Sequence, residues 1–207
     1  MNILLFLLTA ILAYCIGSFS PGILYAKKKA NIDIRQHGSK STGATNVLRV
    51  LGMKASGFVF VLDVLKAVLA CAIGKLLLYS VNPALALYGG IVGGLFVVVG
   101  HNWPVYYGFK GGKGVACSVG LMLFLFPLHG LISIVLCLIV IAATRYVSLG
   151  SMCMLISFAL GIAISYCYEP LLVAWAALLA VLNVFQHRSN IQRLLTGKEN
   201  KLGKKKF

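Results

Sequence analysis

The chain has 207 residues, of which 60% are hydrophobic and 11% are charged, with a formal net charge of +15 at pH 7 and a mean hydropathy of +0.94. This composition excludes an ordinary soluble domain and indicates an integral membrane protein with several spans. The positive charge also suggests nucleic-acid binding, but basic cytoplasmic loops in contact with anionic lipid headgroups explain the charge, so no nucleic-acid partner is expected.

Seven apolar segments follow one another along the chain, and each is a candidate membrane-spanning helix, because a span needs about 20 mostly apolar residues. The fourth and fifth segments are short and are separated only by Pro127, and we interpret them as two tightly turned spans rather than one re-entrant element. We therefore predict a single all-α membrane domain over residues 1–207. The segments are Ile3–Tyr25, Ala55–Tyr79, Ala84–Gly100, Val115–Phe126, Leu128–Thr144, Leu149–Tyr166 and Leu171–Phe185.

Basic residues are concentrated in alternate connections between these segments. The second and fourth connections carry no charge, and the sixth carries only Glu169. Because Lys and Arg accumulate in cytoplasmic loops, the charge pattern predicts seven transmembrane helices with the N-terminus outside and the C-terminus cytoplasmic. The basic residues are Lys27, Lys28, Lys29, Arg35, Lys40, Arg49 and Lys54 in the first connection, Lys110 and Lys113 in the third, Arg145 in the fifth, and Arg188, Arg193, Lys198, Lys201, Lys204, Lys205 and Lys206 in the tail.

The first connection contains a polar run, HGSKSTGATNVLR, over residues 37–49. Its Gly, Ser, Thr and Asn residues precede a helix-compatible segment that contains Arg49, an arrangement suited to presenting backbone N–H groups and hydroxyls to an anion. A guanidinium adds a planar fork that can bind phosphate through two hydrogen bonds. A flexible surface loop with helix-capping residues explains the same run, and the two interpretations remain open at this point.

The third connection is rich in glycine, and it reads GHNWPVYYGFKGGKGVA over residues 100–116. A nucleotide-binding P-loop needs Gly six residues before its Lys and Ser or Thr just after it. Tyr107 and Gly114 occupy those positions, so the ATP-binding interpretation fails. The glycines still allow close approach of the backbone to a ligand, and Lys110 and Lys113 supply charge for a phosphate. His101, taken alone, is as consistent with a structural role as with a ligand contact.

Two further polar clusters lie toward the end of the chain. Arg145 and Ser148 follow the fifth segment, and FQHRSNIQRLL follows the last one over residues 185–195. In a helix, His187 and Asn190 share a face that Arg193 continues, so they are suited to orienting a hydroxyl or transferring a proton. All four clusters fall on the same predicted side of the membrane, which favours phosphate-bearing ligands at the cytoplasmic interface.

Two ionisable residues, Asp63 and Lys66, lie inside the second apolar segment. Ionisable residues within spans are functional candidates by default. The pair also has a simpler explanation, because the two charges can neutralise each other and position a nearby loop arginine. We favour this supporting role.

Three ordered motifs give the chain a resemblance to a known family. GSKSTGATNVLR, GHNWPVYYGFKGGKGVA and HRSNIQRLLTGKE resemble the three signatures of the bacterial membrane glycerol-3-phosphate acyltransferases that use acyl phosphate as donor. The likeness covers nearly the whole chain. The chain departs from the family pattern where Lys40 and Ser41 replace the usual Gly-Asn and where Cys117 replaces Thr.

The resemblance implies transfer of an acyl group from acyl phosphate to the 1-hydroxyl of glycerol 3-phosphate, giving lysophosphatidic acid and phosphate in an early step of phospholipid synthesis. It implies catalytic roles for His187 and Asn190, no metal or other cofactor, and functional coupling to an enzyme that forms acyl phosphate. It also implies a multi-pass protein of the bacterial cytoplasmic membrane, with the active site facing the cytoplasm. The predicted substrate-binding residues are Ser39, Thr45, Asn46, Arg49, Lys110 and Lys113 from the motifs, together with His101, Arg145 and Ser148 from the polar clusters.

No histidine is followed five residues later by aspartate, since Thr42, Tyr106, Ile134 and Gln192 occupy those positions. The pattern therefore disfavours acyl-CoA acyltransferase chemistry, in which a carboxylate orients a His base. The alternative function is a transporter of a phosphorylated small molecule. A transporter is expected to place its polar groups near the middle of the membrane, often on broken helices.

Overall fold

The computed structural model describes residues 2–203, and its regular structure there is helical throughout. This confirms the predicted all-α class. The chain falls into two compact units, the first ending at Leu125 and the second beginning at Phe126. Lys204, Lys205 and Lys206 of the predicted basic tail lie outside the described residues, and the single domain stays a prediction.

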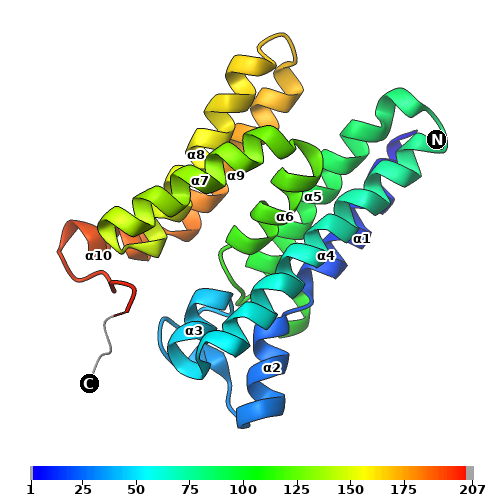
Figure 1. Ribbon diagram of the computed structural model, residues 1–207. Helices are drawn as coiled ribbons and strands as arrows, with labels where there is room; N and C mark the ends of the chain where they lie inside the picture. Colours follow the sequence, from blue (N-terminus) through cyan, green and yellow to red (C-terminus); the bar gives the residue numbers. More distant parts are fainter. Residues whose placement is uncertain (1, 204–207) are drawn as a thin grey trace. The chain divides into compact units, whose positions relative to one another are not determined.

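The first unit is built around the long helix α4, which packs against α1, α5 and α6. The short helices α2 and α3 lie at the end of the unit where α4 begins (Figure 1). The polar run of the first connection is therefore placed at one end of the bundle. The elements are α1 (Asn2–Ser18), α2 (Pro21–Ala30), η1 (Ile34–Gln36), α3 (Ala44–Leu51), α4 (Met53–Tyr79), η2 (Pro83–Leu85), α5 (Ala86–Asn102), η3 (Val105–Tyr107) and α6 (Val115–Leu125).

Glycines on facing helices let the backbones in this unit approach closely. A Cβ atom on Gly74 of α4 would overlap the carbonyl of Gly89 on α5, and one on Gly17 of α1 would overlap the carbonyl of Val97. In a membrane, helices associate largely through such close packing, because lipid tails solvate large apolar side chains as well as a protein interior does. The outward-facing surface accordingly carries exposed side chains such as Leu65 and Leu69.

The first apolar segment is broken between Ser18 and Pro21, where α1 ends and α2 begins. Proline has no backbone N–H, so Pro21 cannot donate the helical hydrogen bond to the carbonyl of Gly17. Lys66 of α4 supplies the missing donor: its Nζ lies 3.0 Å from the Gly17 carbonyl oxygen and 2.7 Å from that of Phe19. A side chain from α4 thus donates hydrogen bonds to the backbone carbonyl groups at the end of α1.

The second unit consists of α7 (Pro127–Thr144), α8 (Val147–Ser165), α9 (Pro170–Gln186) and α10 (Arg188–Leu195). Helix α8 packs against both α7 and α9. The ring of Phe126 contacts those of Phe158, Tyr166 and Trp175 at centroid distances of 5.5–6.1 Å. Helices α9 and α10 form a bent pair with an angle of 59° at His187.

Each of the seven predicted apolar segments coincides with a helix, but not all are long enough to cross a membrane. By length and composition five helices qualify as spans, or six when the bent pair of α9 and α10 is counted as one. Helix α6 has 11 residues, which give a length of roughly 16 Å, about half of the bilayer core. The structure therefore supports a multi-pass membrane protein and leaves the seven spans as a prediction.

Candidate active site

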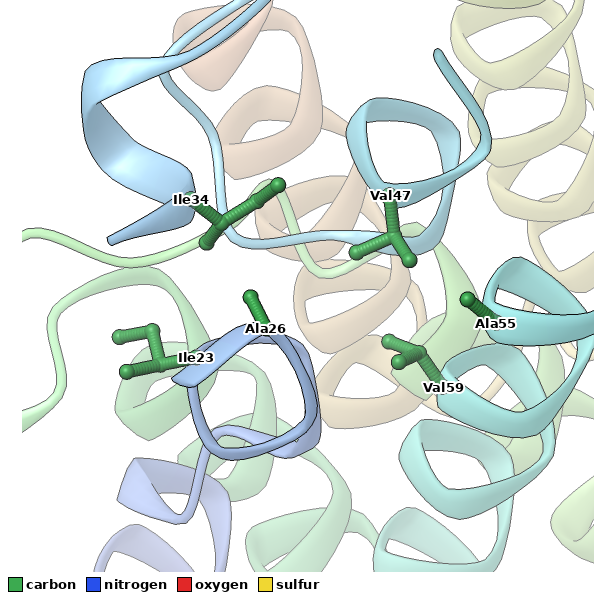
Figure 2. Packing of buried hydrophobic residues seen from close by; sticks show 6 residues of the cluster. All are labelled: Ile23, Ala26, Ile34, Val47, Ala55 and Val59. Carbon is green, nitrogen blue, oxygen red and sulfur yellow. The ribbon is translucent and has the colours of Figure 1, made fainter. Parts of the chain in front are cut away.

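A hydrophobic cluster holds the first polar run on the bundle. Its buried side chains come from four elements and point toward one another (Figure 2). Because Ile34 and Val47 contribute to the cluster from either side of the run, residues 35–46 are fixed at both ends. The six residues are Ile23 and Ala26 of α2, Ile34 of η1, Val47 of α3, and Ala55 and Val59 of α4.

The carboxamide of Asn46 holds the backbone of this run through hydrogen bonds. Its Oδ1 accepts a hydrogen bond from the backbone N–H of Ser39 at 2.7 Å. Its Nδ2 lies 2.8 Å from the Ser41 carbonyl oxygen and 3.0 Å from that of His37. Asn46 is 1% exposed, and its predicted contact with substrate stays a prediction.

The other predicted residues of the run are Ser39, Thr45 and Arg49. Gly38 adopts a left-handed backbone (φ +60°), and a Cβ atom there would collide with Oδ1 of Asn46. Ser39 is exposed at the top of the loop. Thr45 and Arg49 lie four residues apart on α3 and therefore share a face of this helix, with Arg49 exposed. A hydroxyl and a guanidinium are thus presented along one side of α3.

The glycine-rich segment returns from the end of α5 to the start of α6. It turns through left-handed residues at Gly108 (φ +65°), Phe109 (φ +59°) and Gly114 (φ +74°). Lys110 is exposed and Lys113 is partly buried. The segment is anchored by a hydrogen bond of 3.0 Å from the Gly112 N–H to the carbonyl of His101.

Arg35 joins the two loops of the first unit. Its Nε and Nη2 donate to the Asp33 carboxylate at 2.9–3.2 Å, and its Nη1 donates to the Tyr107 carbonyl at 2.9 Å. Hydrogen bonds from Arg35 hold the pKa of Asp33 below its ordinary value. A shallow cavity of about 280 Å³ opens beside this pair, and it brings Lys40 next to Lys110; Asp33, Arg35 and Gln36 complete its lining. The first and second motifs therefore meet at one cationic depression.

In the second unit, His187 lies at the bend between α9 and α10 and is 2% exposed. Its Nδ1 lies 2.8 Å from the Asn183 carbonyl oxygen. A carbonyl oxygen only accepts, so Nδ1 carries a proton, and a neutral ring then presents Nε2 as an acceptor. This tautomer is the one required to accept a hydrogen bond from a substrate hydroxyl.

The carboxylate of Glu199 is hydrogen-bonded to three side chains of the second unit. It accepts hydrogen bonds from Asn190 Nδ2 at 2.8 Å, Arg193 Nε at 2.7 Å and Ser148 Oγ at 3.1 Å. Burial raises the pKa of Glu199, but the hydrogen bonds from Asn190, Arg193 and Ser148 outweigh it, so the net pKa is lowered. The predicted helical face that carries Asn190 and Arg193 is confirmed, and Ser148 joins it through Glu199.

Arg145 holds the C-terminal segment rather than this carboxylate. Its backbone carbonyl accepts from the Leu202 N–H at 2.7 Å, and its Nε donates to the Leu202 carbonyl at 3.0 Å. The side chain is exposed. A role for Arg145 in binding substrate stays a prediction.

Within the described part of the chain, one group of side chains has the geometry of a metal site. Ligand atoms of Asp63, His101 and Cys117 lie within 4.8 Å of one another and are buried. The ammonium of Lys66, however, lies 2.8 Å from Oδ1 of Asp63 and 3.0 Å from Nδ1 of His101. A cation is therefore already built into the cluster, and these residues do not fit a metal ion.

Sequence reasoning missed two residues that shape the site. Glu199 belongs to the third motif, HRSNIQRLLTGKE, and the isolated carboxylate in a basic tail is the signal that identifies it. Arg35 was counted only toward topology, although Asp33 lies two residues before it. Its link to Tyr107 spans 72 residues and leaves no local pattern in the sequence.

The fold is that of a multi-pass helical membrane protein, and each of its two units carries polar residues of the predicted site. A family model described as glycerol-3-phosphate acyltransferase matches residues 7–197. The chain belongs to this family.

Relatives and solved structures agree with this assignment. Proteins named glycerol-3-phosphate acyltransferase are similar to the chain in Thermoanaerobacter sp. strain X514 (49% identical, 96% of each chain covered) and in Clostridioides difficile strain 630 (40%, 100% of each). The crystal structure of PlsY, an integral membrane glycerol 3-phosphate acyltransferase, matches in its glycerol 3-phosphate form with a TM-score of 0.86 and 37% identity, covering 96% of each chain. Its lysophosphatidic acid form matches with a TM-score of 0.84 and 37% identity, covering 96% of this chain and 95% of that one.

Proposed function

We propose that this protein transfers the acyl group of an acyl phosphate to the 1-hydroxyl of glycerol 3-phosphate. The hydroxyl oxygen attacks the acyl carbon, the carbon–oxygen bond to phosphate breaks, and phosphate leaves with that electron pair. Lysophosphatidic acid and inorganic phosphate are the products. The observation that carries the proposal is membership of the acyltransferase family over residues 7–197 together with the three ordered motifs.

Residues of the first unit are proposed to bind phosphate. Ser39 and Thr45 offer hydroxyls, Arg49 offers a planar guanidinium, and Lys110 and Lys113 offer point charges. The left-handed glycines of both loops bring backbone N–H groups close to a ligand. Acyl phosphate is an activated anhydride with a good leaving group, so positioning and charge stabilisation supply most of the acceleration, and no metal is needed.

Residues of the second unit are proposed to orient the reacting hydroxyl. The proton on Nδ1 of His187 leaves Nε2 to accept from the glycerol 1-hydroxyl. Asn190, held by Glu199, presents its carboxamide oxygen to the glycerol moiety. The proton of the hydroxyl passes to the departing phosphate, so His187 aligns the nucleophile rather than serving as the final base.

We further propose that the protein crosses the cytoplasmic membrane seven times, with the N-terminus outside and the active site on the cytoplasmic side. The alternation of basic and uncharged connections supports this orientation. Seven crossings require the short helix α6 to cross together with the glycine-rich segment before it. A location beside the lipid surface also suits coupling to an enzyme that forms acyl phosphate.

The donor is tested with purified protein in detergent. With glycerol 3-phosphate and long-chain acyl phosphate, in the presence of EDTA and without nucleotide, mass spectrometry is expected to detect lysophosphatidic acid. Acyl-CoA is expected to be a poor donor, because no histidine is paired with a carboxylate in the H-x-x-x-x-D pattern. A His187→Ala variant prepared in the same way controls for contaminating activity. Efficient turnover with acyl-CoA and none with acyl phosphate would overturn the proposal, and absence of acyl transfer from either donor would favour the transporter alternative.

A further inference from the structure

We propose that Asp63, Lys66 and His101 form a buried positioning network that sets the place of the glycine-rich loop at residues 108–114. The network acts on substrate binding through the backbone that carries Lys113. This inference rests on the proposed function only in taking Lys113 as a phosphate ligand.

The Lys66 ammonium lies among polar groups from three helices. Its Nζ lies 3.0 Å from the carbonyl oxygen of Gly17, 2.7 Å from that of Phe19 and 3.0 Å from Nδ1 of His101. Oδ1 of Asp63 lies 2.8 Å away and has no directional hydrogen bond, so the aspartate contributes compensating charge at close range. Asp63 is 1% and Lys66 is 7% exposed. Lys66 therefore ties the broken end of α1 to the last turn of α5.

Both the ring and the backbone of His101 contact the glycine-rich loop. Nδ1 of His101 lies 3.0 Å from the Lys66 ammonium and 3.3 Å from Oδ1 of Asp63, so the Nδ1 side of the ring faces the network and the Nε2 side faces away from it. That side of the ring lies against Gly112, where a Cβ atom would collide with Nε2. The Gly112 N–H also donates to the His101 carbonyl at 3.0 Å. Gly112 directly precedes Lys113, so the place of the ring fixes the start of the lysine-bearing turn.

The broken end of α1 makes a second connection to the same segment. The Val105 N–H donates to Ser18 Oγ at 3.3 Å, and Tyr14 Oη donates to the Trp103 carbonyl at 2.8 Å. A shift of α1 is therefore transmitted to residues 103–105 as well as to His101. Lys66 contacts both elements that support the loop, the end of α1 and the last turn of α5.

A purely structural ion pair is the competing explanation. Ion pairs buried in a protein often contribute little net stability, because desolvation offsets their attraction. If Asp63 and Lys66 serve only the fold, neutralising them together is expected to leave the kinetics of the folded protein unchanged. If they position the loop, a folded neutral variant binds glycerol 3-phosphate poorly, since a displacement of about 1 Å can cost on the order of 100-fold in rate.

The test uses a double-mutant cycle with the full-length protein in detergent. The neutral pair Asp63→Asn/Lys66→Gln leaves no unpaired charge, and the introduced carboxamide can still donate to the carbonyls at the end of α1. Its kcat/KM for glycerol 3-phosphate is expected to fall by about ten- to a hundredfold, mainly through KM. Lys75→Gln is the matched control: Lys75 lies on the same helix over the ring of Phe124, and its loss is expected to leave KM unchanged.

The cycle is closed in a Lys113→Ala background. Because the network acts through Lys113, the neutral pair is expected to cost little more there, whereas independent effects multiply. Wild-type kinetics in a folded neutral pair, or multiplied losses in the combined variant, would overturn the proposal. If the neutral pair does not fold, His101→Asn is used instead, since it keeps the Asp63–Lys66 pair and removes the ring beside Gly112. A raised KM for glycerol 3-phosphate is expected, and an unchanged KM would overturn the proposal. All results are ratios to the wild type with whichever donor supports turnover, so a wrong donor assignment does not affect them.

Discussion

Replacing Glu199 by Gln tests how the second unit holds Asn190. The amide oxygen can take the place of Oε1, which accepts from Asn190 and Ser148, but the amide nitrogen then faces Nε of Arg193 across 2.7 Å. Two donors oppose each other where a charge-assisted hydrogen bond stood. Hydrogen bonds to charged groups contribute about 1.5–3 kcal/mol. The Arg193 side chain is 34% exposed, so we expect a loss of about 2 kcal/mol after allowance for solvent screening.

For a chain of this size, a loss of about 2 kcal/mol corresponds to a decrease in Tm of about 4–8 °C. Thermal unfolding in detergent at pH 7 measures it. The folded-state pKa of Glu199 is lowered, so its contribution is fully present above the ordinary Glu pKa of about 4.3 and is lost as pH falls through the folded-state pKa. An unchanged Tm at pH 7, or a difference from wild type that persists in acid, would refute this account.

Two further predictions concern the first unit. Arg49→Lys keeps the charge but loses the planar fork, which costs about 1.5–3 kcal/mol of interaction. We therefore expect kcat/KM for glycerol 3-phosphate to fall by about ten- to a hundredfold, with normal membrane insertion. Wild-type steady-state kinetics would show that Arg49 serves only to orient the protein in the membrane. Gly38→Ala places a Cβ against Oδ1 of Asn46 in a left-handed backbone that costs roughly 1–2 kcal/mol, so we expect a lower Tm and lower activity. Gly57→Ala is the control: a Cβ there meets nothing within 4 Å, and neither property is expected to change. Equal behaviour of the two variants would contradict the need for a fixed loop conformation at Gly38.

The helices were predictable because long apolar runs fix their own secondary structure, and the seven predicted segments all coincide with helices. The short length of α6 was also predicted, as Val115–Phe126, but apolarity alone does not decide whether a helix of 11 residues crosses a membrane. The break at Pro21 illustrates the difference. Proline was visible in the sequence, but the donor that completes the chain there comes from Lys66, on a different helix.

The motifs identified the residue types of the site but not their protein partners. The Nδ2 groups of Asn46 and Asn190 both donate to protein acceptors, and the contact of either residue with substrate stays a prediction. A motif shows only that a carboxamide is needed at a position, whereas its partners depend on tertiary packing. The ion pair between Asp63 and Lys66 was correctly predicted, since three residues of separation place them on one helical face, whereas their positioning of a loop arginine stays a prediction. Their contact with His101 spans 35 residues from Lys66 and was beyond any local pattern.

The break in the first apolar segment also bears on the order of biogenesis. When α1 enters the bilayer, the carbonyl of Gly17 has no helical donor, because Pro21 cannot supply one. Its partner, Lys66, is synthesised 49 residues later than Gly17, and it arrives with Asp63 one turn away, which lowers the cost of carrying an ammonium into lipid. The break between α1 and α2 therefore acquires its hydrogen-bond donor only once α4 has packed against α1.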